Sequence, residues 1–376
     1  MKNYGRTSIY EFLGDRVVYR NLSPLDPTLP SLADICRLAG LPEGLIPRKS
    51  SPEYARVVAE FLRCARRADA PGTSIERLIY LGDTRMNDGT AFANLCREGG
   101  WPGLAFIGDE KDNPAPVVVT EWEGQTMCLA NHWSALYELD ELARQRGFTL
   151  DEHTAVVIDL DKTALGARGR NDHVIDRARV LALMRTVEGL LGDVFDPEAF
   201  QTAYDHLNRP EYHPFTADNQ DYLAYICLIL GSGQYSLETL QAEIKSGGLT
   251  TFAQFITQVD SRIDSLPANL RDIHTSIYDY VRQGDPTPFK SFRYNEYRAT
   301  AERMGCLSDD TPASELLKEE LVITQEVRQL VLRWREQGAL LFGLSDKPDE
   351  AALPPPDLAA QGYQPIHRIE THALGE

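Results

Sequence analysis

The chain has 376 residues, a formal net charge of −18 and 43% hydrophobic residues. Its length predicts two or three domains, and its hydrophobic content is sufficient for a sizeable core. The acidic balance argues against a surface for nucleic-acid polymers or anionic membranes, because no basic field attracts their phosphates. A small phosphorylated ligand needs only local positive charge, so this class of ligand remains open.

The cysteines and the apolar runs indicate the cellular compartment in which the protein is expected. The six cysteines are widely scattered and form no CxxC pair, which argues against a structural zinc site. No apolar run approaches the roughly 20 residues of a membrane span, and the amino terminus carries no signal-peptide pattern. We therefore expect a soluble, cytoplasmic protein without a membrane partner, whose oligomeric state the sequence does not indicate.

The amino-terminal half alternates helices with short strands. Residues 1–44 are mixed in character and are interpreted as an extension. A capping serine and an early proline open a helix at Ser50. Short apolar runs predict strands at 78–81 and 104–107 with a helix between them, and a further helix is expected over 133–146.

The carboxyl-terminal half combines buried strands with a long helical region. The run 155–158 is rich in β-branched residues, which is typical of a buried parallel strand. Amphipathic patterns, one of them over 197–207, dominate from about 172 to 325 and predict an all-helical domain inserted after this strand. Further strands are expected near residues 341 and 367. Strands that alternate with helices predict an α/β protein with a mainly parallel sheet.

Two acidic residues, Asp159 and Asp161, directly follow the strand at 155–158. In an open α/β sheet, ligands bind at the carboxyl ends of the strands. Two carboxylates ~4 Å apart repel each other by about 4 kcal/mol at an effective dielectric of about 20. This repulsion favours a metal-assisted acid site, and the simpler alternative is that one of the two acids caps the next helix.

A second acidic segment, with Gly82, Asp83, Asn87 and Asp88, follows the strand at 78–81. The small Gly82 permits a close approach of the backbone, and Asp83 emerges at the strand end. Carboxylate oxygens in such a position suit Mg²⁺, which prefers hard oxygen ligands. The alternative is an ordinary turn, because Asn-Asp-Gly is itself strong turn chemistry.

Ser345 and Lys49 are the remaining candidates for a binding site. Ser345 follows the strand expected near 341, where a hydroxyl and backbone amides can hold phosphate oxygens. Lys49 precedes the helix that opens at Ser50, where its ammonium group can pair with phosphate and with acidic groups. The simpler alternatives are a helix cap at Ser345 and a solvated side chain at Lys49.

Together these segments resemble the four motifs of the haloacid dehalogenase-like superfamily, whose members are mostly phosphohydrolases. The first family motif, an apolar strand followed by DxDxT, matches Asp159, Asp161 and Thr163. The second motif, a strand that ends in Ser or Thr, matches Ser345. The third, a lysine shortly before a helix that contains proline, matches Lys49.

The fourth family motif, GDxxxD or GDxxxxD, matches Gly82, Asp83 and Asp88, with Asn87 at the shorter spacing. Whether Asp88 or Asn87 supports the metal is open at this point. The family order is first, second, third and fourth motif, whereas this chain has the third, fourth, first and second. This is a cyclic shift, and a sheet whose termini lie close together tolerates such a circular permutation.

The resemblance implies a three-layer, Rossmann-like parallel sheet core with a large inserted all-helical cap domain. The core is expected at 45–170 and 323–376, the cap at 171–322, and an amino-terminal extension at 1–44.

The resemblance also implies a Mg²⁺-dependent phosphohydrolase that acts on a small phosphate ester. Asp159 is expected to attack phosphorus and form an aspartyl-phosphate, and Asp161 to act as general acid and then as general base. The expected ligands are Asp159, Asp161, Asp83 and Asp88 for Mg²⁺, and Thr163, Ser345 and Lys49 for phosphate.

Two alternatives remain at this level. A phosphomutase would use the same aspartyl nucleophile, and a catalytically silent protein of the same fold would only bind its ligand. The residues do not identify the substrate, nor the cap residues that select it.

Overall fold

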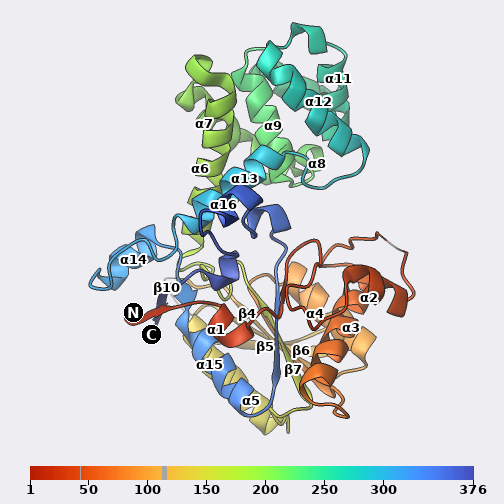
Figure 1. Ribbon diagram of the computed structural model, residues 1–376, viewed down its shortest axis with the longest axis vertical. Helices are drawn as coiled ribbons and strands as arrows, with labels where there is room; N and C mark the ends of the chain where they lie inside the picture. Colours follow the sequence, from red (N-terminus) through yellow and green to blue (C-terminus); the bar gives the residue numbers. More distant parts are fainter. Residues whose placement is uncertain (43, 112–116) are drawn as a thin grey trace. The chain divides into compact units, whose positions relative to one another are not determined.

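The computed structural model describes residues 1–42, 44–111 and 117–376. These described residues divide into two compact units, Met1–Arg177 with Thr300–Glu376 and Ala178–Ala299. The first unit holds the β-sheets and the second is built from helices (Figure 1). No helix in the described part of the chain is long and apolar enough to cross a membrane.

The first unit is organised around a mainly parallel sheet. Among the described residues this sheet has seven strands, in the order β2–β9–β7–β3–β4–β6–β5. Neighbouring strands run parallel, and the pair β5 and β6 is antiparallel. The strand bounds are Val17–Val18 (β2), Arg77–Gly82 (β3), Gly103–Gly108 (β4), Val118–Trp122 (β5), Gln125–Ala130 (β6), Thr154–Asp159 (β7) and Leu340–Leu344 (β9). The prediction of an α/β protein with a mainly parallel sheet is confirmed.

Helices cover both faces of this sheet (Figure 1). One face carries α2 (Leu32–Leu38), α3 (Pro52–Asp69) and α4 (Asn87–Gly99), and the other carries α1 (Tyr10–Leu13), α5 (Leu136–Gln145) and α15 (Gln325–Glu336). This arrangement is compatible with a three-layer α/β core.

Helix α3 illustrates how the sequence builds this packing. Ser51 caps its amino end by accepting a hydrogen bond from the Tyr54 amide, and Pro52 occupies the first turn. The apolar face of the helix buries Phe61, which stacks on Phe342 of β9 with ring centroids 6.3 Å apart. The same helix start follows Lys49 directly, so its cap also positions that lysine.

A small second sheet brings the chain ends together. Among the described residues it has three strands in the order β1–β10–β8, with bounds Lys2–Thr7 (β1), Thr371–Gly375 (β10) and Ile323–Thr324 (β8). Strands β1 and β10 are antiparallel, with Lys2 opposite Gly375. Figure 1 shows the two termini side by side.

The prediction of a strand near residue 367 was wrong. Ile366–Arg368 form a single 3₁₀ turn after Pro365, and the strand that follows, β10, belongs to the small sheet. The edge position beside β9 is taken by β2, which comes from the amino-terminal segment. Two residues are too few to produce a periodic pattern of their own.

The second unit has an aromatic and aliphatic core in which Phe255 and Tyr225 are fully buried. Helix α6 (Asp172–Leu191) begins in the first unit and continues into the second. The remaining helices of the second unit are α7 (Pro197–Leu207), α8 (His213–Thr216), α9 (Gln220–Gly231), α10 (Leu237–Ser246), α11 (Phe252–Asp260), α12 (Ala268–Arg282) and most of α13 (Lys290–Ala301). Two short helices, α14 (Ala313–Glu319) and α16 (Pro356–Ala359), belong to the first unit.

Candidate functional site

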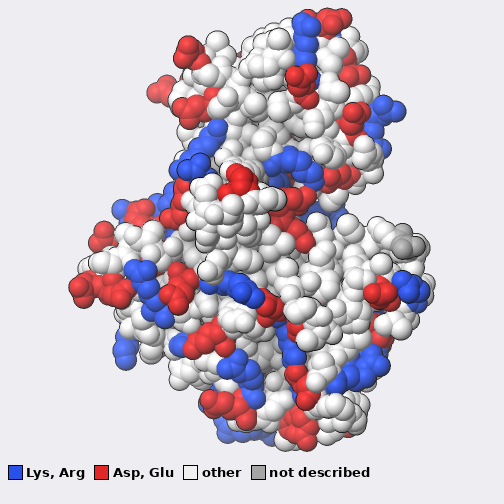
Figure 2. Space-filling model, in the orientation of Figure 1, with Lys and Arg blue, Asp and Glu red and all other residues white. Residues whose placement is uncertain are grey.

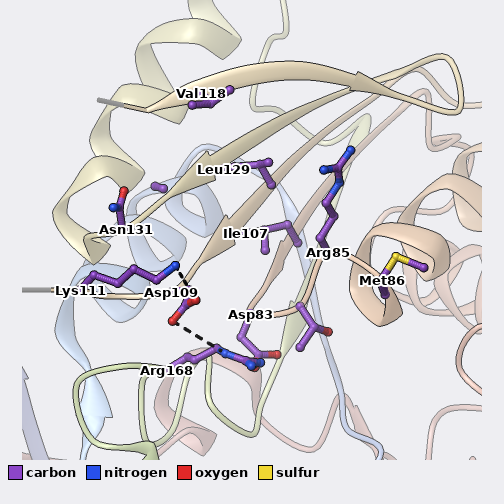
Figure 3. A pocket seen from close by; sticks show the side chains of 12 residues that line it. Asp83, Arg85, Met86, Ile107, Asp109, Lys111, Val118, Leu129, Asn131 and Arg168 are labelled. Carbon is purple, nitrogen blue, oxygen red and sulfur yellow. Dashed lines mark hydrogen bonds and ion pairs between the residues drawn. The ribbon is translucent and has the colours of Figure 1, made fainter. Parts of the chain in front are cut away.

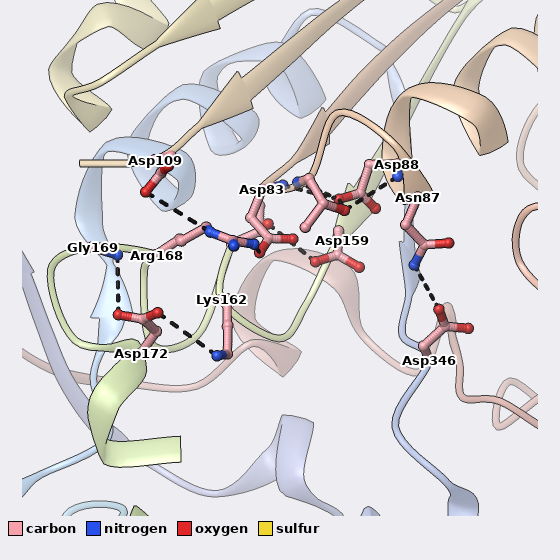
Figure 4. A network of polar contacts seen from close by, with 12 residues as sticks. Asp83, Asn87, Asp88, Asp109, Asp159, Lys162, Arg168, Gly169, Asp172 and Asp346 are labelled. Atoms are coloured by element: carbon pink, nitrogen blue, oxygen red, sulfur yellow. Dashed lines mark hydrogen bonds and ion pairs between the residues drawn. The ribbon is translucent and has the colours of Figure 1, made fainter. Parts of the chain in front are cut away.

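Three adjacent strands of the central sheet end at the same edge, and each end carries a predicted site residue. Asp159 is the last residue of β7, with Leu344 of β9 opposite it. Ser345 follows β9, and Asp83 follows β3, the neighbour of β7 on its other side. The parallel register therefore brings these segments to one edge (Figure 4).

A group of three carboxylates forms at this edge. Asp83, Asp88 and Asp159 each offer an oxygen, and these atoms lie within 4.8 Å of one another. In the described part of the chain this is the one group of three acidic, histidine or cysteine side chains close enough to hold a metal ion. At that separation two ionised carboxylates repel by about 3–4 kcal/mol at an effective dielectric of about 20, so the group requires a cation or a proton.

Lys49 supplies one buried cation to this group. Its Nζ lies 2.5 Å from Asp159 Oδ1 and 2.7 Å from Asp88 Oδ1, although Lys49 and Asp159 are 110 residues apart in the sequence. Burial lowers the pKa of Lys49, but the charges of Asp159 and Asp88 outweigh this effect and hold the pKa well above its usual value. Lys49 therefore stays charged at neutral pH, and the alternative of a solvated side chain does not apply to it.

Asp88 anchors the turn after β3. Its Oδ2 accepts hydrogen bonds from the Asp83 amide at 3.1 Å and from the Thr84 amide and hydroxyl, both at 2.8 Å. The Tyr80 hydroxyl donates to its Oδ1 at 3.2 Å. Burial raises the pKa of Asp88, but Lys49 and the Thr84 amide outweigh this effect and lower the pKa to about 2.

Gly82 explains why the turn can place Asp88 there. A Cβ built on Gly82 would lie 2.6 Å from both Cβ and Cγ of Asp88, closer than side chains approach each other. The neighbouring Asn87 points elsewhere, since its Nδ2 donates to Asp346 Oδ2 at 2.8 Å (Figure 4). Asp88, and not Asn87, therefore belongs to the acidic group.

Asp83 and Asp159 are the two carboxylates whose ionised forms are destabilised by burial and by neighbouring negative charges. Burial and the charge of Asp88 raise the pKa of Asp83 to about 7, although Arg168 Nη1 donates to its Oδ2 at 2.8 Å. Burial raises the pKa of Asp159 well above its usual value, and the charges of Asp88 and Asp83 add to this effect against Lys49. Both side chains therefore favour an added proton or cation.

Asp161, Thr163 and Ser345 complete the predicted residues. Ser345 Oγ donates to Asp161 Oδ2 at 3.1 Å and accepts a bond from the Lys347 amide at 2.9 Å. Thr163 Oγ1 donates to Asp159 Oδ2 at 3.1 Å, which orients that carboxylate. The side chain of Asp161 is half-buried and lies outside the three-carboxylate group.

Two further residues lie at the site that the sequence did not assign to catalysis, phosphate or metal. Arg168 comes from the loop after Thr163 and pairs with Asp83, a contact that no motif spacing reveals. The Tyr54 hydroxyl is buried and has no hydrogen-bond partner among the described residues, while burial and the nearby Lys49, Asp346 and Asp159 shift its pKa, with a net rise. The start of α3 thus presents a polar atom whose bonding is incomplete next to Lys49.

The donor set fits a hard divalent cation. Its oxygens come from carboxylates, which suit Mg²⁺, and it contains no thiolate or imidazole among the described residues of the group. Lys49 and Arg168 contribute two positive charges against three carboxylates, so a net negative charge remains to attract a cation.

Comparison of the chain with protein-family models, with curated proteins and with solved structures gives no match. Function is therefore inferred from the residues and the geometry of this edge.

Proposed function

We propose that this protein is a Mg²⁺-dependent phosphohydrolase of the haloacid dehalogenase-like type that acts on a small phosphate ester. The observation that carries this proposal is the meeting of Lys49 with Asp88 and Asp159, from three segments that were singled out separately in the sequence. A structural ion pair needs one acid for one lysine, whereas this group holds acids in excess. Buried acids in excess at the ligand-binding edge of a parallel sheet favour catalysis over a purely structural role.

The close chain termini support the circularly permuted order of the motifs. Strands β1 and β10 pair directly, so a chain joined at these ends would follow the same path through the sheet with different termini. The resemblance assigns the role of cap, which closes over the site and excludes water, to the helical second unit.

Mg²⁺ would be held by the side chains of Asp159 and Asp83 and by the main-chain carbonyl of Asp161, with Asp88 in support. When bound, it would offset the repulsion between the attacking carboxylate and the phosphate dianion. The chemistry of the donors fits this ion, because each of these ligands is a hard oxygen.

The side chains of the protein would carry out the transfer in two steps. In the first, an oxygen of Asp159 attacks phosphorus while the bond to the leaving oxygen breaks, and Asp161 gives that oxygen its proton. In the second, Asp161 takes a proton from water, which attacks the aspartyl-phosphate and releases inorganic phosphate and the free Asp159 carboxylate.

Lys49, Ser345 and Thr163 would position the reacting groups. Lys49 and Thr163 already bond the two oxygens of Asp159, so they orient the nucleophile before the substrate arrives. The Ser345 hydroxyl, which donates to Asp161, can donate to a phosphoryl oxygen when substrate is bound.

Release of inorganic phosphate from a panel of phosphate monoesters, with Mg²⁺ and with EDTA, tests this proposal. We expect release that requires Mg²⁺ and falls at least about a thousandfold in Asp159→Asn, because the nucleophile is lost. The exposed Asp310→Asn is the matched control and should retain activity. Activity of Asp159→Asn near that of the wild type would remove Asp159 as nucleophile, and transfer without net release would indicate a phosphomutase.

A further inference from the structure

The edge of the sheet opens into a cavity next to Asp83 (Figure 3). Its volume is about 510 Å³, within the range of small-molecule sites. Asp83 and Arg168 line it on the side of the acidic group. The cavity therefore borders the acidic group through Asp83, one of its three carboxylates.

The floor of this cavity is apolar. Ile107 of β4 lies opposite Leu129 of β6, and Leu129 lies opposite Val118 of β5, so the three side chains form a row on one face of the sheet. Val118 is 54% exposed, which is unusual for an apolar residue in a concave site. A polyhydroxylated leaving group would lose hydrogen bonds to water over this row, whereas an aromatic or aliphatic body would gain contacts.

One cation above this floor is available to a ligand. Arg85 comes from the same turn as Asp83, and its guanidinium carbon lies 4.6 Å from the centre of the Trp122 ring. It forms no ion pair with an acidic residue in the part of the chain that the structure describes. The guanidinium is thus held by an aromatic ring, and none of the described carboxylates pairs with it.

The other described cations that line the cavity already have acidic partners. Lys111 pairs with Asp109 at 3.2 Å, and Arg168 pairs with Asp83 at 2.8 Å (Figure 3). Arg85 is therefore the group that a second negative charge on the substrate would find.

We propose that this cavity binds the leaving group, and that the substrate is a phosphate monoester whose leaving group combines an apolar body with a second anionic group held by Arg85. This inference rests on the proposed phosphohydrolase function and specifies its substrate class. Sugar phosphates, which carry neither feature, are expected to be poor substrates.

Two isosteric esters test the charge requirement. The ratio of kcat/KM for 4-carboxyphenyl phosphate to that for 4-carbamoylphenyl phosphate is expected to be roughly ten in the wild type, because a charge-assisted pair with Arg85 is gained. In Arg85→Gln the ratio should fall to about one. The control Arg37→Gln changes an exposed arginine that does not line the cavity and should keep the wild-type ratio.

The apolar floor has its own test. Val118→Asp should lower kcat/KM for both aryl esters, because a carboxylate in the floor is costly to desolvate. The ratio of kcat/KM for each aryl ester to that for glucose 6-phosphate should therefore fall. A wild-type ratio near one between the isosteric esters, or a ratio that Arg85→Gln leaves unchanged, would overturn the inference while phosphate release itself persists.

Direct binding separates failure of this inference from failure of the proposed function. Titration calorimetry with 4-carboxyphenylphosphonate and 4-carbamoylphenylphosphonate needs no turnover. Preferential binding of the carboxylate by the wild type, lost in Arg85→Gln, supports the cavity assignment even if no ester is hydrolysed. Equal binding of the two phosphonates by the wild type would contradict it.

Discussion

The two units each bury a cluster of charged side chains, and the clusters differ in charge balance. In the second unit Arg293 bonds Asp221 and Glu296, and Arg179 bonds Glu296 at 3.2 Å. These four described side chains are two arginines and two acids. In the first unit Lys49 and Arg168 face three carboxylates, so acids remain in excess.

This difference, together with the position at the ligand-binding ends of the parallel strands, separates a structural cluster from the candidate site. A balanced buried cluster ties helices together and has no use for an added ion, because each charge already has its partner. An unbalanced cluster at the edge of a sheet is destabilised until a cation or proton arrives. The distribution of surface charge does not mark the candidate site. Among the described residues on the face in Figure 2, basic and acidic side chains lie interspersed.

The largest expected effect on stability lies in the balanced cluster. Arg293→Leu leaves Asp221 and Glu296 buried without their main partner, and we expect it to lower the free energy of unfolding by about 3–5 kcal/mol. Urea denaturation measures this loss. The exposed Arg282→Leu, also in the second unit, should change the free energy of unfolding by less than about 0.5 kcal/mol, and equal losses in the two variants would contradict the structural role.

Gly82→Ala tests how the turn positions the acidic group. The added methyl would meet Asp88 at 2.6 Å, so we expect a loss of about 1–3 kcal/mol in stability, together with reduced phosphate release. Gly189→Ala is the control, because a Cβ there meets no atom within 4 Å and the residue lies in helix α6. An active, fully stable Gly82→Ala protein would show that Asp88 need not occupy its observed place.

Removal of one carboxylate should stabilise the metal-free protein. Burial and Asp88 raise the pKa of Asp83 to about 7 in the folded state, whereas the unfolded chain releases this proton near pH 4. Ionised Asp83 therefore destabilises the folded state fully above about pH 7, and its effect fades as the pH falls toward 4.

In EDTA at pH 8 we expect Asp83→Asn to gain about 1–2 kcal/mol in the free energy of unfolding, and to gain little at pH 4.5. Thermal unfolding at both pH values, with Asp310→Asn as control, measures the difference. A loss of stability at pH 8 would mean that the Arg168 contact outweighs the repulsion among the acids.

The smallest expected effect is that of Asn87→Ala, and it distinguishes Asn87 from its neighbour Asp88 in the turn. Asn87→Ala removes only an exposed hydrogen bond to Asp346, so we expect a change below about 0.5 kcal/mol and nearly intact phosphate release. Asp88→Asn should instead lower activity strongly, because Lys49 loses a charged partner. Comparable activity losses in both variants would contradict the assignment of Asp88 to the acidic group.

The sequence predicted those parts of the fold whose patterns are long or strongly periodic. The amphipathic pattern over 197–207 corresponds to helix α7, Pro197–Leu207, and the apolar run 155–158 lies within β7. The β5–β6 hairpin was not predicted, although it supplies much of the cavity floor. Its outer strand is an exposed edge, so it lacks the alternation that burial on one face imposes.

The candidate site was predicted as a set of residues but not as a set of contacts. Spacing alone could not choose between Asn87 and Asp88, because the hydrogen bonds of the turn at Thr84 decide which side chain faces Lys49. The pairing of Arg168 with Asp83 depends on a loop in which Gly169 packs against the backbone of Glu110 at positive φ. Such contacts arise from tertiary packing and leave no local signature.

The most direct test of the account is an anomalous difference map from crystals grown with Mn²⁺ in place of Mg²⁺. We expect a strong peak within coordination distance of carboxylate oxygens from both Asp83 and Asp159, lost in crystals of Asp159→Asn. Crystals without a peak at this edge, or with a peak that persists in that variant, would contradict the claim that these separate segments of the chain together hold a divalent cation.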